Sequence, residues 1–173
     1  PNYGFSLNII DIDASFTLGE MAREKQQSLK KLKAEGIYEL NKSISFPKLP
    51  QRIAVISVQT SKGYQDFINI LSSSSTHFNL ETKLFTALLQ GDKAITSIVE
   101  ALEQVESRVD EFDVVTIIRG GGGDVGLNCY DSYILASKVA RFPLPVVTGI
   151  GHSSNETLVE MVSYTNKITP TDV

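Results

Sequence analysis

The segment best suited to chemistry is Arg119 followed by four consecutive glycines, Gly120, Gly121, Gly122 and Gly123. Glycines leave backbone N–H groups uncovered, and they can turn toward an anion in conformations that other residues rarely adopt. The adjacent guanidinium can add a bidentate phosphate contact. The segment has neither the G-x-G-x-x-G spacing of a dinucleotide-binding turn nor the Gly-Lys-Ser/Thr of a P-loop. We therefore predict a phosphate site of another kind, the alternative being a mobile loop with an incidental arginine.

His152 and Asp66 are the next candidates. His152 follows a Gly-Ile-Gly turn, and its imidazole titrates near neutral pH, so it can exchange a proton with a phosphate ester. The alternative role of His152 is to cap the helix that follows. Asp66 falls in the first turns of a predicted helix, where the helix dipole alone favours a carboxylate. A catalytic role for Asp66 therefore depends on the arginine and the histidine lying nearby.

Metal and thiol chemistry have weaker support. Glu156 and Glu160 are four residues apart, so on a helix they would share a face and could hold a divalent metal with Asp66. The alternative is a pair of solvated surface carboxylates. No motif surrounds Cys129, which we expect to pack in the core, and His77 falls in a polar loop. A single cysteine excludes an internal disulfide and fits a reducing cytosol.

Short apolar runs alternate with helical stretches after residue 50. The predicted strands are 53–58, 80–86, 114–118 and 145–150, and the predicted helices are 64–71, 93–109, about 132–141 and one that begins near Asn155. This alternation predicts an α/β fold, an open, mostly parallel Rossmann-like sheet with helices on both faces. Ligands bind beyond the carboxyl ends of such strands. The first, third and fourth strands lead into Thr60, Arg119 and His152, so these residues should meet at one edge, with Thr60 a further phosphate contact.

The chain is expected to have three parts. These are a remnant strand at 1–14, a helix and linker at 15–50, and an α/β catalytic domain at 51–173. Tyr3–Ile12 alternates apolar and polar residues but has no partner strand, which favours a sheet truncated from a longer protein. The helix has Ser15 or Thr17 as its candidate cap and ends at Gly36. Two prolines make Phe46–Pro50 an extended linker.

Composition narrows the function classes. The 173 residues are 42% hydrophobic and 21% charged, as in ordinary globular proteins. With 16 basic and 20 acidic side chains, the net charge is −4, which argues against a freestanding basic nucleic-acid clamp but leaves room for a local anion site. The apolar runs are too short to cross a membrane, and no signal peptide is visible.

Together these features resemble the large subunit of exodeoxyribonuclease VII. The resemblance is carried by the stretch from Tyr3 to Ser57 and, in the family's order and spacing, by "IIRGGG", "LPVVTGIGH" and "ITPT". It implies hydrolysis of single-stranded DNA from either end into short 5′-phosphorylated products. It also implies that residues 1–14 end an N-terminal OB-fold. A helical arm missing from this chain would bind several copies of a small subunit, giving a cytoplasmic hetero-oligomer.

The resemblance assigns roles residue by residue. The family's catalytic aspartate, arginine and histidine correspond to Asp66, Arg119 and His152. Its second aspartate, three residues after the histidine, is Asn155 here; an amide can hydrogen-bond but cannot carry the charge or take the proton. The family's Glu-Asp after the glycines is also missing, replaced by Val125 and Gly126, and its serine after the third glycine is Gly123. No metal ligand is implied, because the family is not described as strictly requiring a divalent cation.

Three alternatives remain open. The substitution at Asn155 and the missing Glu-Asp are consistent with a catalytically weakened scaffold for the small subunit. The glycine loop could instead belong to an unrelated α/β module that binds a nucleotide or sugar phosphate. The third alternative is a Mg²⁺-dependent nuclease that uses Asp66, Glu156 and Glu160.

Overall fold

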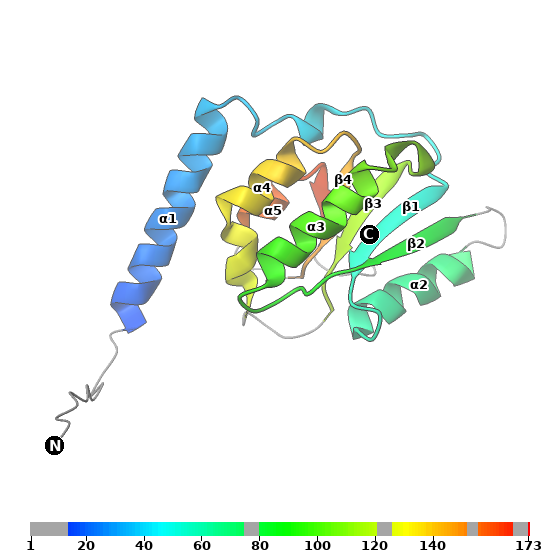
Figure 1. The fold of residues 1–173 in the computed structure, drawn as a ribbon, viewed down its shortest axis with the longest axis horizontal. Helices are drawn as coiled ribbons and strands as arrows, with labels where there is room; N and C mark the ends of the chain where they lie inside the picture. The colour runs from blue at the N-terminus through cyan, green and yellow to red at the C-terminus, as the bar shows by residue number, and fades with distance from the viewer. Residues whose placement is uncertain (1–13, 75–79, 121–125, 152–155, 168–172) are drawn as a thin grey trace, which may run out of the picture.

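The computed structural model describes residues 14–74, 80–120, 126–151, 156–167 and 173 (Figure 1). In this part of the chain, five parallel strands form one sheet in the order β2-β1-β3-β4-β5. The strands are β1 (Arg52–Ser57), β2 (Glu81–Thr86), β3 (Val114–Ile118), β4 (Val146–Gly149) and β5 (Thr165–Asn166). The helices are α1 (Ala14–Ala34), α2 (Lys62–Ser74), α3 (Ala94–Glu106), α4 (Tyr133–Ala140) and α5 (Leu158–Val162), with 3₁₀ turns η1 (Asn41–Ser43), η3 (Val109–Glu111) and η4 (Leu127–Asp131). The predicted open parallel α/β fold is confirmed.

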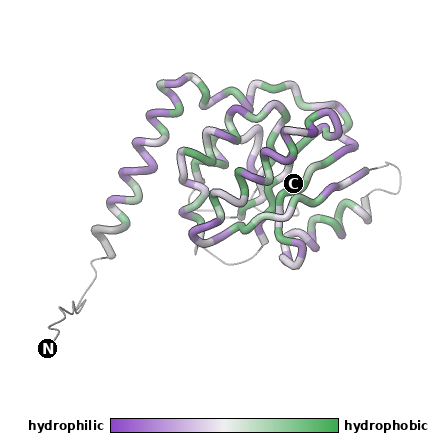
Figure 2. Tube along the Cα trace, in the orientation of Figure 1, coloured by the Kyte–Doolittle hydropathy of each residue, from purple (hydrophilic) through white to green (hydrophobic). Residues whose placement is uncertain are grey.

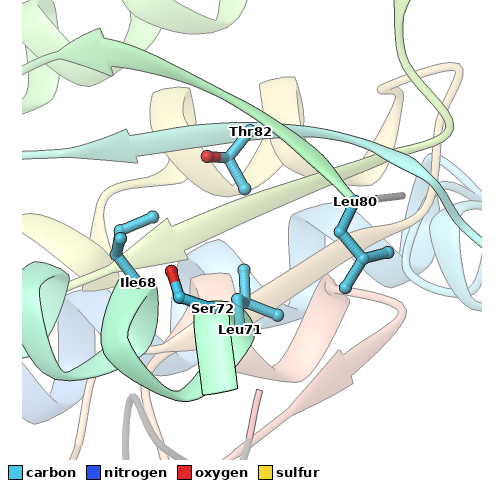
Figure 3. A pocket seen from close by; sticks show the side chains of 5 residues that line it. All are labelled: Ile68, Leu71, Ser72, Leu80 and Thr82. Carbon is cyan, nitrogen blue, oxygen red and sulfur yellow. The ribbon is translucent and has the colours of Figure 1, made fainter. Parts of the chain in front are cut away.

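Alternate residues of the central strands face opposite layers of the molecule. Figure 2 shows these strands as the hydrophobic centre, whereas α1 carries both hydrophilic and hydrophobic residues. On one face, Val55 and Ile118 pack with Phe67 of α2. Between α2 and β2 remains a pocket of about 60 Å³, lined by Ile68, Leu71, Ser72, Leu80 and Thr82 (Figure 3).

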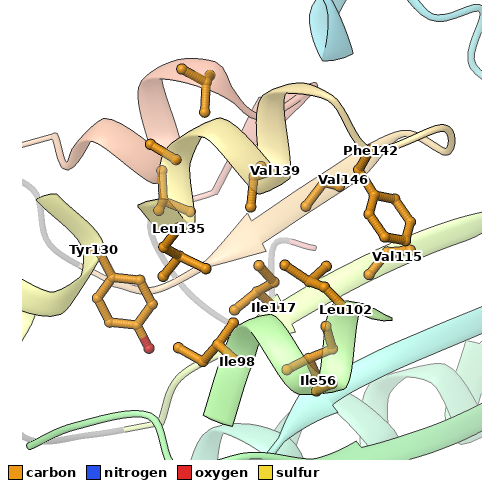
Figure 4. Packing of buried hydrophobic residues seen from close by; sticks show 14 of the residues in the cluster. Ile56, Ile98, Leu102, Val115, Ile117, Tyr130, Leu135, Val139, Phe142 and Val146 are labelled. Atoms are coloured by element: carbon orange, nitrogen blue, oxygen red, sulfur yellow. The ribbon is translucent and has the colours of Figure 1, made fainter. Parts of the chain in front are cut away.

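The other face of the sheet holds the larger core. Ile56 and Ile117 lie opposite each other in register and pack with Ile98 of α3 and Leu135 of α4 (Figure 4). Burial of four such side chains removes enough apolar surface to hold both helices on the sheet. Helices therefore cover both faces, as the alternating pattern predicted.

The segment before the sheet begins with the long helix α1. Its end at Gly36 is confirmed, since that glycine has a positive φ of 70°. The candidate caps Ser15 and Thr17 are both wrong, because α1 already begins at Ala14 and both residues lie within it. After α1 the chain packs on the domain through the buried residues Ile37 and Asn41.

The last helix also differs from the sequence prediction. It begins at Leu158, not near Asn155, because Thr157 is its N-cap. Thr157 accepts the backbone N–H of Glu160, and the Glu160 carboxylate accepts the Thr157 N–H at 2.7 Å, forming a capping box. Glu156 therefore precedes the helix, and the expectation that Glu156 and Glu160 share a helix face is wrong.

Candidate phosphate site at the carboxyl edge of the sheet

A pocket of about 240 Å³ opens where the first three strands end. It is lined by Val58 and Ser61 after β1, by Leu88, Leu89 and Gln90 after β2, and by Arg119 and Gly120 after β3. In the strand order 2-1-3-4-5, the connections leave β1 and β3 in opposite directions, and the crevice between these strand ends is where doubly wound sheets bind ligands. The pocket lies at this switch point.

The turn between β1 and α2 is built from two serines. Ser57, the last residue of β1, donates its hydroxyl to the carbonyl oxygen of Ile118 at 2.7 Å and so ties the ends of β1 and β3 together. The hydroxyl of Ser61 accepts the backbone N–H of Tyr64 at 3.2 Å, which makes Ser61 a cap for the first turn of α2. Because Ser61 also lines the pocket, the positive end of the α2 dipole borders it.

Arg119 lies at the pocket and is only 4% exposed as a residue. Its backbone N–H donates to the carbonyl oxygen of Gly149 at 3.0 Å, which extends the β3–β4 ladder by one residue and fixes the backbone. Burial raises the pKa of Tyr130 and of the Cys129 thiol, and the Arg119 charge opposes both shifts, so the guanidinium acts on these neighbours. A cation held at such low exposure interacts with an anion more strongly than one in water.

Gly120 brings the end of β3 into backbone contact with the start of α2. A Cβ at this position would collide with the backbone nitrogen of Gly63 and lie 2.5 Å from its Cα and 3.2 Å from the carbonyl carbon of Lys62. Glycine is therefore needed at position 120 for this approach. It places the first turn of α2 directly beside the residue that follows Arg119.

Asp66 and Thr60 lie around this site rather than in the pocket lining. Asp66 is half-buried and comes three residues after Gly63, so it shares that side of α2, one turn farther along. Thr60 is exposed, and the pocket lining takes Ser61 instead. The other predicted site residues, Gly121, Gly122, Gly123, His152 and Asn155, lie outside the described residues.

The prediction that the first, third and fourth strands end at one edge is confirmed. β1, β3 and β4 are parallel neighbours, and β4 leads through Gly149 and Gly151 into the segment that begins with His152. Sequence reasoning missed Ser61 and the Leu88–Gln90 part of the lining. The sequence indicates both parts. A serine just before a predicted helix is typical of a helix cap, which points to Ser61. The residues after β2 belong at the same edge because all strands of a parallel sheet end there.

Other sites are poorly supported by the described residues. No group of three His, Cys, Asp or Glu side chains among them could hold a metal ion. Cys129 is buried, as predicted, and its S–H donates to the carbonyl oxygen of Gly126 at 3.3 Å. The pocket beside α2 is too small for a nucleotide. None of the helices described is long and apolar enough to cross a membrane.

The fold and the pocket define a doubly wound α/β domain with a buried arginine and a glycine turn at its switch point. Residues 37–173 match the family described as "Exonuclease VII, large subunit". The chain belongs to the exonuclease VII large subunit family.

Relatives named exodeoxyribonuclease 7 large subunit agree with this assignment. The protein from Deinococcus radiodurans is 34% identical over 172 residues, which covers 98% of this chain and 41% of that protein. The protein from Lactobacillus helveticus is 30% identical over 154 residues, or 89% of this chain and 34% of that protein. For Campylobacter fetus the identity is 30% over 155 residues, or 89% and 39%. The chain thus spans less than half the length of these relatives.

Proposed function

We propose that this chain is the catalytic domain of a nuclease large subunit that hydrolyses phosphodiester bonds in single-stranded DNA. It would act from either end and release short 5′-phosphorylated products. Membership of the family supports the nuclease class. The single observation that carries the proposal is the buried Arg119 beside Gly120 and the capped start of α2, because this arrangement suits a phosphate group.

In the proposed mechanism, water attacks the phosphorus and negative charge grows on the non-bridging oxygens. Arg119 and the backbone N–H groups of Gly120, Gly121 and Gly122 would stabilise that charge, which is usually the largest contribution to such catalysis. Gly123 would complete the turn.

Four further side chains would complete the site. His152 would be the general acid or base. Asp66 would orient His152 or the water, and Asn155 would hydrogen-bond where relatives use a charged carboxylate. Thr60 would bind a neighbouring phosphate, consistent with its exposure beside the pocket. The reaction requires no divalent metal in this proposal.

The proposed partners are single-stranded DNA and several copies of a small subunit. The small subunit would bind a helical arm outside this chain, giving a hetero-oligomer that works in the cytoplasm. The names of the relatives, which specify a large subunit, support a second subunit.

The role of Arg119 is tested in the full-length large subunit assembled with its small subunit. We expect Arg119→Ala to lower kcat on a single-stranded oligonucleotide on the order of 10²-fold or more, as for the loss of a transition-state donor. Arg119→Lys should recover part of the rate, because a lysine keeps the charge but not the planar fork.

Arg108→Ala is the matched control. Arg108 follows α3 and pairs with Glu111 at 2.7 Å, just before β3 and hence at the opposite edge of the sheet. Its removal should leave kcat unchanged. Wild-type turnover by Arg119→Ala would refute the proposed mechanism.

Chelation separates the metal-independent mechanism from the Mg²⁺ alternative. We expect full activity in excess EDTA. The capping box occupies the Glu160 carboxylate, which supports this expectation over a cation held by Asp66, Glu156 and Glu160. Complete loss of activity that Mg²⁺ restores would favour the metal-dependent enzyme.

A scaffold role is the second candidate, because Asn155 replaces a carboxylate that the family resemblance leads us to expect. A complex that assembles but cleaves no single-stranded DNA would support this role. Asn155→Asp would then be expected to restore cleavage if the missing carboxylate is the cause.

A further inference from the structure

Lys25 joins α1 to the chain just before α5. Its ammonium donates to the carbonyl oxygen of Glu156 at 2.6 Å and pairs with the carboxylate of Asp131 at 3.1 Å. Glu156 and Asp131 are far from Lys25 in the sequence but close to it in space, because α1 packs against α4 (Figure 1). Lys25 is 22% exposed and Asp131 30% exposed, so both charges are partly shielded from water.

Asp131 extends this connection to the first helical residue of α5. The oxygen that receives the Lys25 ammonium also accepts the backbone N–H of Leu158 at 2.9 Å. One lysine and one aspartate therefore hold a carbonyl group and an N–H group only two residues apart. Charge-assisted hydrogen bonds of this length are among the stronger ones in proteins.

The remaining polar groups of this short segment are held as well. The Glu156 carboxylate accepts the side-chain amide of Asn166 at 2.7 Å. Thr157 donates both its backbone N–H and its hydroxyl to Glu160, each at 2.7 Å. Residues 156–158 consequently form a fixed point in the chain, directly after Asn155.

Holding α1 on the domain does not require Lys25. Directly after the helix, Tyr133 donates its hydroxyl to the Glu35 carboxylate at 2.7 Å, and Arg141 pairs with the same carboxylate at 3.2 Å. Lys31 lies over the Tyr133 ring at 3.8 Å. The position of the Lys25 ammonium therefore has a consequence of its own, which is to fix residues 156–158.

We propose that Lys25 and Asp131 are positioning residues that couple α1 to residues 156–158. Because this inference rests on the proposed function, its consequence is that they set the geometry of the reaction through the chain that carries His152 and Asn155. Neither residue lines the pocket at Arg119. Their loss should act on kcat rather than on substrate binding, since misplacement by about 1 Å can cost about 10²-fold in rate.

The test uses the full-length large subunit with its small subunit. Lys25→Met removes the charge at nearly constant size, and Lys25→Arg keeps it. We expect Lys25→Met to lower kcat on the order of 10-fold with little change in KM, and to speed amide hydrogen exchange across residues 156–162. Lys25→Arg should recover most of both properties. Asp131→Asn, which keeps an acceptor for the Leu158 N–H, should resemble Lys25→Met in kcat.

Tyr133→Phe is the matched control, because it weakens another attachment of α1 without touching residues 156–158. It should lower the melting temperature about as much as Lys25→Met while keeping wild-type kcat. Unchanged exchange at residues 156–162 in Lys25→Met, or an equal loss of kcat in Tyr133→Phe, would overturn the inference. A wild-type complex without nuclease activity would instead refute the proposed function, and hydrogen exchange would still decide whether the coupling exists.

Discussion

Asn41 is completely buried, and its side-chain amide makes four hydrogen bonds to the backbone. The amide nitrogen donates to the carbonyl oxygens of Phe142 and Leu144, and the amide oxygen accepts the N–H groups of Val146 and Tyr164. These partners lie at the starts of β4 and β5, so one side chain fixes the segment after α1 to the sheet.

We expect Asn41→Ala to lower the free energy of unfolding by about 2–4 kcal/mol, because it removes the side-chain partner of four buried or partly buried backbone groups. Urea denaturation measures this loss. Asn128→Ala is the control, since Asn128 is exposed and should change stability by less than about 0.5 kcal/mol. Equal effects of the two substitutions would contradict the role given to Asn41.

Asp113 stabilises the opposite edge of the sheet in a pH-dependent way. Its carboxylate accepts the N–H groups of Gln51 and Arg52, each at 2.9 Å, and pairs with the Arg52 guanidinium. The hydrogen bond from the Arg52 side chain is the main cause that lowers the pKa of Asp113 to about 2. Because the folded-state pKa lies below the usual 3.8, the stabilisation is present above about pH 4 and is lost as the pH falls toward 2.

We therefore expect Asp113→Asn to cost about 1–2 kcal/mol of unfolding free energy at pH 7, with the difference from wild type shrinking between about pH 4 and pH 2. Urea titrations at several pH values measure it. Asp92→Asn, at an exposed position, controls for the change in net charge. A wild-type minus variant difference that is constant with pH would contradict the assignment.

At the scale of the elements, the contact between β3 and α2 depends on Gly120. We expect Gly120→Ala to push the start of α2 away from Arg119, because the new Cβ would collide with the Gly63 backbone, which cannot move as a flexible side chain can. Both the free energy of unfolding and kcat should fall, by about 1–3 kcal/mol for an overpacked site and on the order of 10-fold for the misplaced donors.

The control for this substitution is Gly19→Ala. A Cβ at Gly19 meets nothing within 4 Å, and Gly19 lies inside α1, so alanine there should stabilise the helix by about 0.5–1 kcal/mol. Thermal melts and oligonucleotide turnover distinguish the two variants. Normal melting and normal turnover of Gly120→Ala would show that the end of β3 tolerates a wider spacing from α2.

The strands that position the site could be predicted from the sequence because they are buried on both faces. The predicted strand Val114–Ile118, apolar apart from Thr116, matches β3, and β1 and β4 differ from their predicted ranges only at the ends. β5 was missed, since two residues, Thr165 and Asn166, carry no periodic signal. The sequence contains the Thr157–Glu160 capping-box pattern, yet the sequence prediction starts this helix earlier, near Asn155.

The candidate site was predictable only in part, for a related reason. Parallel strands must end at one edge, so the shared location of Thr60, Arg119 and the end of β4 followed from the strand assignment alone. Which side chains line the pocket depends on packing between the strand ends. Ser61 lines it and Thr60 does not, a distinction that no spacing rule makes.

At the scale of the whole molecule, the net negative charge opposes the binding of DNA, whereas the pocket at Arg119 suits a phosphate. Residues 51–173 hold 9 basic and 14 acidic side chains, and the basic residue at the pocket, Arg119, is buried. Binding of single-stranded nucleic acid usually depends on a positive groove and stacking aromatic rings. A domain of this charge can hold one phosphate in a pocket without holding a long strand across its surface.

We therefore expect the 173-residue chain to bind a fluorescent oligodeoxythymidylate weakly, with a Kd of about 10⁻⁴ M or higher at 150 mM salt, and to cleave it poorly. Fluorescence anisotropy across a salt series measures both the affinity and the number of ions released. The full-length large subunit should bind more tightly and with a steeper salt dependence, because residues outside this chain would contact additional phosphates. Arg119→Ala in the 173-residue chain should reduce the salt slope by no more than about one ion, as expected for a single phosphate contact. Submicromolar binding by the 173-residue chain at that salt concentration would mean that its own surface binds the DNA strand. It would contradict the expectation that residues outside this chain make most of the DNA contacts.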